Sequence, residues 1–62
     1  MIEQIERRAL AVFGDPDKAR RWLTKPKRQL GGLTPLAAAE ASPEGAAAVL
    51  ELLERIDRGH FP

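Results

Sequence analysis

Few side chains in this 62-residue chain could take part in catalysis. The only histidine is His60 and there is no cysteine, so the chain cannot supply the ligands of a zinc site or a thiol nucleophile with its base. Glu51 and Glu54 lie three residues apart, but arginines flank them, which favours ordinary ion pairs over a general acid and base. The sequence therefore predicts a protein that is not an enzyme and that holds no metal or cofactor.

The pair Gly31-Gly32 is the stretch that most suggests a nucleotide site, because glycines let backbone amides approach phosphate groups. The pair is not followed by the lysine and hydroxyl residue that end a P-loop, and no predicted strand precedes it. A tight turn leading into the next helix fits the pair better. We interpret both glycines as structural.

Four helices are expected from the spacing of apolar residues and from the residues that begin and end helices. Three dipeptides combine a capping side chain with a proline at the first helical position: Asp15-Pro16, Thr34-Pro35 and Ser42-Pro43. The predicted helices span about residues 2–13, 16–24, 35–41 and 43–58, with a loop over about 25–33. Nothing indicates a strand. The predicted fold class is all-α, a compact bundle of about four short helices in a single domain, residues 1–62.

The last predicted helix carries more apolar surface than a small core needs. Val49, Leu53 and Ile56 lie along one face, and Leu52 widens it. A chain of this length buries only about 60% of the surface that its unfolded form exposes, so a partner chain would add needed stability. We therefore expect a homodimer with an interface formed by Val49, Leu52, Leu53 and Ile56.

Charge is distributed unevenly, although the formal net charge is only +1. The segment from Lys18 to Arg28 holds six basic residues and no acidic one, whereas five acids and two arginines lie between Glu40 and Arg58. Such a basic cluster is most often a solvated face, but it also occurs on surfaces that contact acidic proteins or nucleic acid. No aromatic residue interleaves the loop to stack on bases, which argues against nucleic acid as the partner.

No apolar run is long enough to span a membrane or to form the core of a signal peptide. The absence of cysteine also removes the disulfide framework that is typical of small secreted domains. We therefore expect a cytoplasmic protein without a membrane partner.

A set of short motifs occurs in a fixed order along the chain: Val12-Phe13-Gly14-Asp15, Lys18-Ala19, Trp22-Leu23, Leu30-Gly31-Gly32 with Thr34-Pro35-Leu36, Glu44-Gly45-Ala46, and Leu53-Glu54-Arg55-Ile56 with Gly59 and Phe61. From Ala9 onward, this combination resembles the C-terminal toxin-binding domain of the Xre, MbcA and ParS antitoxins. The helical spacing of Trp22 and the properties of Gly31, Gly32, Thr34 and Pro35 indicate that these five residues set the fold.

The resemblance implies that the chain binds a protein. Members of this family dimerise through this domain and hold a toxin of the RES type, an enzyme that consumes NAD or uses it to ADP-ribosylate a target. The resemblance also implies that the end of the antitoxin chain blocks the NAD pocket of the toxin. We therefore expect toxin contacts from Arg55, Arg58, Gly59, His60 and Phe61, with help from Lys27 and Arg28 in the loop.

Longer family members carry a helix-turn-helix domain ahead of this one, and no such domain is present in these 62 residues. We expect either a stand-alone inhibitor or a trimmed chain, without DNA binding of its own. Two alternatives stay open. The first is a small nucleic-acid-associated module that uses the basic Lys18–Arg28 face, and the second is a bare dimerisation module.

Overall fold

The computed structural model describes residues 2–59. Within this range the chain forms the helices α1 (Ile2–Phe13), α2 (Pro16–Leu23), α3 (Pro35–Ala41) and α4 (Pro43–Asp57), and no strand. The prediction of an all-α fold is therefore confirmed for the described residues, and the predicted helix ends agree to within one residue. The loop contains one element that was not predicted, the 3-10 turn η1 (Arg28–Leu30).

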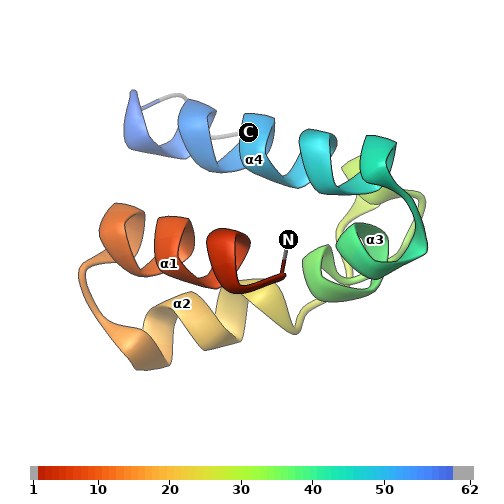
Figure 1. Cartoon of the computed structure of the whole chain (residues 1–62). Coiled ribbons are helices and arrows are strands. Elements are labelled where there is room, and N and C mark those ends of the chain that lie inside the picture. Colours follow the sequence, from red (N-terminus) through yellow and green to blue (C-terminus); the bar gives the residue numbers. More distant parts are fainter. Residues whose placement is uncertain (1, 60–62) are drawn as a thin grey trace.

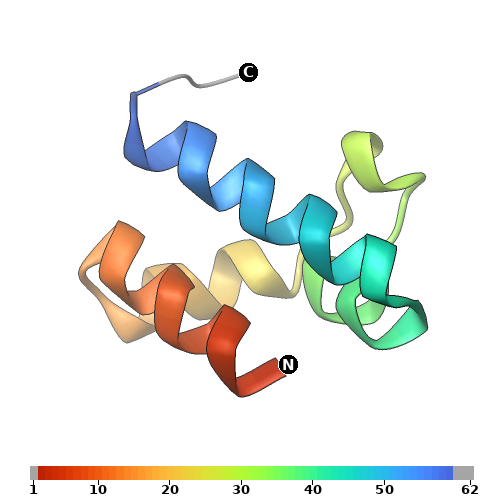
Figure 2. The ribbon, with the colours of Figure 1, turned by 45° about the horizontal axis from the view of Figure 1, so that its top comes forward.

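The helices stack around α1. One side of α1 packs against α2 and the other against α4, while α3 closes one end of the bundle by packing chiefly on α4 (Figure 1). A second view shows that α1 and α4 run toward the same end of the molecule (Figure 2). This arrangement brings the C-terminal part of α4 beside α1.

Side-chain caps begin three of the helices. The Asp15 carboxylate accepts a hydrogen bond from the Asp17 amide at 2.9 Å, the Thr34 hydroxyl from the Ala37 amide at 3.1 Å, and the Ser42 hydroxyl from the Gly45 amide at 2.9 Å. Each cap satisfies an amide that has no partner within its helix, and such caps are worth about 1 kcal/mol. The proline that follows each cap stands at the first helical position, as the dipeptides predicted.

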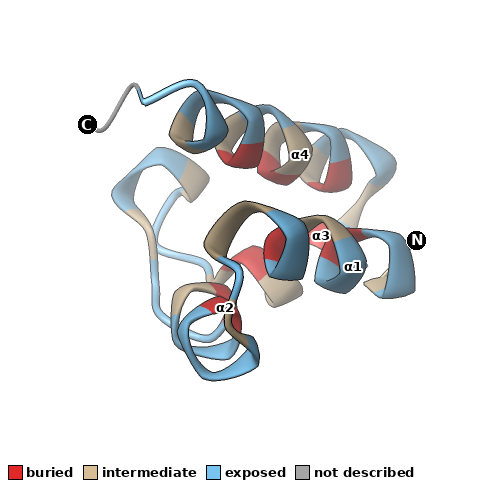
Figure 3. Ribbon diagram, turned by 90° about the vertical axis from the view of Figure 1, so that its left-hand side faces the viewer, coloured by how far each residue is buried: buried red, intermediate tan, exposed pale blue. Residues whose placement is uncertain are grey.

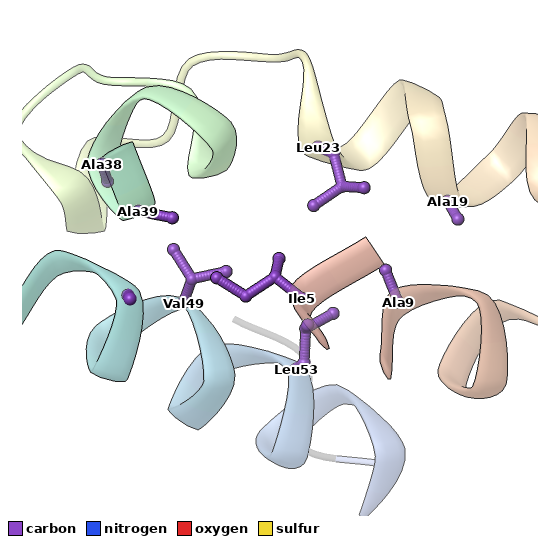
Figure 4. Close-up of a cluster of buried hydrophobic side chains, with 9 residues drawn as sticks. Ile5, Ala9, Ala19, Leu23, Ala38, Ala39, Val49 and Leu53 are labelled. Atoms are coloured by element: carbon purple, nitrogen blue, oxygen red, sulfur yellow. The ribbon is translucent and has the colours of Figure 1, made fainter. Parts of the chain in front are cut away.

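The core is thin because small residues dominate it. It contains nine buried hydrophobic residues, and five of these are alanines, so the helix backbones approach one another closely. Ile5, Val49 and Leu53 are the fully buried large side chains of the cluster, and Leu23 lies beside them with little exposure (Figure 4). The buried residues face inward from all four helices, whereas most of the outward surface of α2 is exposed (Figure 3). None of the nine lies beyond Leu53.

Helices α3 and α4 approach each other closely at Gly45. A Cβ atom built on Gly45 would lie 2.8 Å from the carbonyl carbon of Ala38, and closer still to its oxygen. Cβ atoms essentially never come within 3.0 Å of such an atom, so a side chain here would force the two backbones apart. The motif Glu44-Gly45-Ala46 thus has a packing reason that neither composition nor helical periodicity could provide.

Candidate functional site

The predicted binding residues of α4 begin with two exposed arginines. Arg55 donates to Glu51 at 2.7 Å and Arg58 donates to Glu54 at 3.2 Å, each four residues along the helix. All four side chains are about half exposed or more, so each pair contributes only a few tenths of a kcal/mol. Both guanidinium groups could therefore exchange these weak pairs for a carboxylate or phosphate of a partner.

A third arginine joins α1 to this end of α4. The guanidinium of Arg8 lies 3.6 Å from a carboxylate oxygen of Glu54 and 3.7 Å from one of Asp57. The sequence offered no signal for this contact, because it joins residues that are 46 and 49 positions apart. The acids near the end of α4 are thus largely neutralised within the chain.

The helix ends at a glycine in the left-handed conformation. Gly59 has a φ of 84°, and its amide donates to the carbonyl of Ile56 at 3.0 Å, while the Arg58 amide donates to the carbonyl of Glu54 at 3.1 Å. These bonds satisfy the last carbonyls of α4 and turn the chain off the helix axis. His60 and Phe61, the other two residues of the expected tail contact, lie outside the described residues.

The four residues of the expected dimer interface divide into two pairs. Val49 and Leu53 have no exposed surface in the single chain, because they form part of its own core. Leu52 and Ile56 lie one turn apart and keep part of their surface exposed. In this fold only Leu52 and Ile56 can reach a second chain, which reduces the expected interface of α4 to half of its members.

The basic loop is held in place by its own backbone and by an aromatic ring. The Lys27 amide donates to the Leu33 carbonyl, and the Lys27 carbonyl accepts from Leu30 and Gly32, all at 3.0 Å. The ammonium of Lys27 lies 5.1 Å from the centre of the Trp22 ring, within the range of a cation–π interaction. Burial, and to a lesser degree the neighbouring charge of Lys25, lowers the pKa of Lys27. Lys27 is therefore a support of the loop as well as one of its charges.

The residues that were interpreted as structural occupy positions that explain their types. Trp22 is half-buried against the core, with its ring centre 5.9 Å from that of Phe13. Gly31 and Gly32 have φ angles of 66° and 87°, which side-chain-bearing residues adopt only with strain. Thr34 caps α3 and Pro35 is buried. These residues build the turn and do not form a nucleotide cradle.

The loop and α4 meet at a shallow hollow of about 160 Å³. Gln29 and Leu30 line it from the loop, and four residues line it from α4: Ala48, Glu51, Leu52 and Arg55. Arg28 is exposed and directly precedes the two loop residues. The structure thus brings the predicted loop contacts and the predicted contacts of α4 to neighbouring positions, although they are more than twenty residues apart in sequence.

The described residues also bear on metal binding and on insertion into a membrane. Within this range, no three histidine, cysteine, aspartate or glutamate side chains stand close enough together to hold a metal ion. The helices of this range are also too short or too polar for any of them to cross a membrane. What the described surface offers is exposed arginines and lysines beside half-buried leucines, which is the chemistry of protein contacts.

Comparison with known proteins identifies the family. Residues 8–59 match the profile of the antitoxin Xre/MbcA/ParS C-terminal toxin-binding domain. The chain belongs to this family. The antitoxin Xre of Pseudomonas putida is 44% identical to it over 52 residues, which cover 84% of this chain and 32% of the relative. This toxin-binding domain therefore spans about a third of the length of the curated relative that it matches. No solved structure matches it.

The residues that match the family profile include the features that fix the backbone of this fold. The matched range ends at Gly59, two residues after the last residue of α4, and it includes the capped helix starts, the glycine turn and the contact at Gly45. Each of these features fixes backbone geometry. The side chains left for recognition are the exposed ones that lie between these structural features.

Proposed function

We propose that this chain neutralises a RES-type toxin, an enzyme that consumes NAD or ADP-ribosylates a target, by covering its NAD site with the segment from Arg55 to Pro62. The match of residues 8–59 to a toxin-binding domain carries the proposal, together with the 44% identity to an antitoxin Xre. The chain acts in this proposal as a binding protein of the cytoplasm, without catalysis of its own.

The geometry of α4 supports a role for its C-terminal end. The buried core ends at Leu53, so residues that follow can contact a partner while the core stays closed. Arg55 and Arg58 are exposed, and a guanidinium group forms paired hydrogen bonds to carboxylates and phosphates. At Gly59 the left-handed backbone ends the helical conformation just before the proposed tail contact.

We further propose that the chain is a homodimer through Leu52 and Ile56. Both are partly exposed leucine or isoleucine side chains on α4, and Leu52 borders the hollow that the loop shares with this helix. A small core built largely of alanines benefits from additional apolar burial.

Co-expression with the product of the adjacent reading frame tests the neutralisation. Deletion of residues 59–62 should leave a folded chain that no longer protects cells, with cellular NAD falling or target modification appearing. A matched variant of full length, with His60→Gly and Phe61→Gly, separates the chemistry of the tail from its length. Circular dichroism should show the same helix content and melting temperature for the two full-length proteins. The truncated chain should melt only slightly lower, because it loses the bond from Gly59 to Ile56 but keeps the core, which ends at Leu53.

Continued protection by the truncated chain would show that the tail does not block the NAD site. If the double glycine variant protects cells and the truncated chain does not, the length of the tail, and not the side chains of His60 and Phe61, is what blocks the NAD site. The proposal as a whole fails if the parent chain neither binds nor inhibits the product of the adjacent frame.

A further inference from the structure

The ion pairs of the described residues lie at α1 and α4, whereas the basic residues of α2 and the loop take part in none of them. All ion pairs among residues 2–59 use acids of α4 and the arginines Arg8, Arg55 and Arg58. Within the same range, no acidic side chain lies within ion-pair distance of the basic residues of α2 and the loop. Five of these are exposed, and we call them the basic patch: Lys18, Arg20, Arg21, Lys25 and Arg28.

The free chain holds these like charges together at an electrostatic disadvantage. Lys18 and Arg21 are three residues apart on α2, a spacing at which like charges repel across one turn. Farther along, burial and, second to it, the charge of Lys25 lower the pKa of Lys27. An anionic partner would relieve this repulsion, because it would place negative charge beside the whole group.

The patch is also rigidly presented. Lys27 fixes the loop through its backbone bonds and through its contact with the Trp22 ring, so that Lys25 and Arg28 project from a defined turn. Binding to a preorganised surface loses less conformational entropy than binding to a flexible one. The loop continues into the hollow that contains Leu52 and Arg55, so the patch adjoins the end of α4.

We propose that the basic patch steers this chain onto an acidic surface of its protein toxin, ahead of the contact made by the end of α4. The inference rests on the proposed function and adds the chemistry of the docking surface and its kinetic role. Charges at the rim of an interface mainly change the association rate and its salt dependence, whereas buried contacts mainly change the dissociation rate. An acidic protein surface is favoured over nucleic acid, because Trp22 is half-buried beneath Lys27 and unavailable for base stacking.

Stopped-flow association with the purified product of the adjacent reading frame tests the proposal. For the parent chain, the association rate should fall as NaCl rises from about 0.01 M to about 0.15 M. The variant with Arg20→Gln, Arg21→Gln, Lys25→Gln and Arg28→Gln should associate at least about tenfold more slowly at the lower salt. Its dissociation rate should stay within about twofold of the parent, and it should still inhibit the toxin at saturating concentration.

A matched pair of single variants separates the patch from net charge. Arg21→Gln and Arg7→Gln each remove one positive charge from an exposed helical arginine without an ion pair in residues 2–59. Only Arg21 belongs to the patch, so only Arg21→Gln should reduce the salt dependence of association. Equal effects of the two variants would overturn the proposal, as would a parent association rate that salt does not change.

Two other outcomes would also overturn it. Salt-sensitive binding of the parent to duplex DNA, lost in the fourfold variant while toxin association is unchanged, would assign the patch to nucleic acid. Failure of the parent to bind the toxin at all would end the proposed function and this inference together. Toxin binding that is independent of the patch would end this inference alone.

Discussion

Substitution of Gly45 by alanine offers the sharpest test of the packing, because two physical effects predict opposite signs. Alanine is the better helix former, so propensity alone predicts a gain of up to about 1 kcal/mol. The contact between α3 and α4 predicts a loss, because the added Cβ would lie 2.8 Å from the carbonyl carbon of Ala38 and closer to its oxygen.

The loss should exceed the gain. Overpacking of a core typically costs about 1–3 kcal/mol, and the upper end applies here because the added Cβ, fixed directly to α4, meets backbone atoms of α3 that cannot rotate away. Subtracting the propensity term leaves a net destabilisation of about 2 kcal/mol. For a domain of this size, 1 kcal/mol shifts the melting temperature by roughly 4–8 °C, so Gly45→Ala should lower it by roughly 8–16 °C.

Thermal and urea unfolding followed by circular dichroism at 222 nm would measure the change. Ala47→Gly is the matched control, since Ala47 is exposed on the same helix and its loss of propensity should cost about 1 kcal/mol without any collision. A Gly45→Ala variant as stable as the parent, or more stable, would refute the reasoning. It would show that α3 and α4 can separate freely.

Two further predictions concern the loop and the proposed dimer. The lowered pKa of Lys27 means that the charge over the Trp22 ring is lost at a lower pH than for an ordinary lysine, so tryptophan emission should change over that alkaline interval. Lys27→Met should abolish this change in emission. The same pH dependence of emission in the parent and in Lys27→Met would contradict the contact. The double variant with Leu52→Asn and Ile56→Asn should be a monomer where the parent is a dimer, as measured by light scattering. Leu10→Asn, which changes an exposed leucine of α1, should leave the dimer intact. A parent chain that is already monomeric would exclude the proposed interface.

Much of the local structure could be predicted because it depends on residues within about four positions of one another. A capping side chain followed by proline begins a helix wherever it stands, and Thr34 and Ser42 act in this way. The pair formed by Glu51 and Arg55 likewise depends on helical geometry alone. The motifs that the chain shares, in the same order, with the antitoxin family also indicated the class of partner.

The tertiary structure decided which predicted residues remain available for binding. Helical periodicity places Val49, Leu52, Leu53 and Ile56 on one broad face, but only the positions of α1 and α3 determine which part of that face is covered. Val49 and Leu53 are buried by those neighbours, whereas Leu52 and Ile56 stay partly exposed. A prediction from α4 alone could not separate the two pairs.

The same limit applies to contacts between distant parts of the chain. Arg8 reaches Glu54, 46 positions further along the chain, because α1 and α4 run toward the same end. Such contacts depend on how whole helices pack, and no short sequence window contains both partners. The sequence by itself determined the helices, their caps, the glycine turn and the uneven charge. Only the packing of those helices placed Arg8 beside Glu54 and Asp57, and only it decided which apolar residues of α4 are buried and which stay partly exposed.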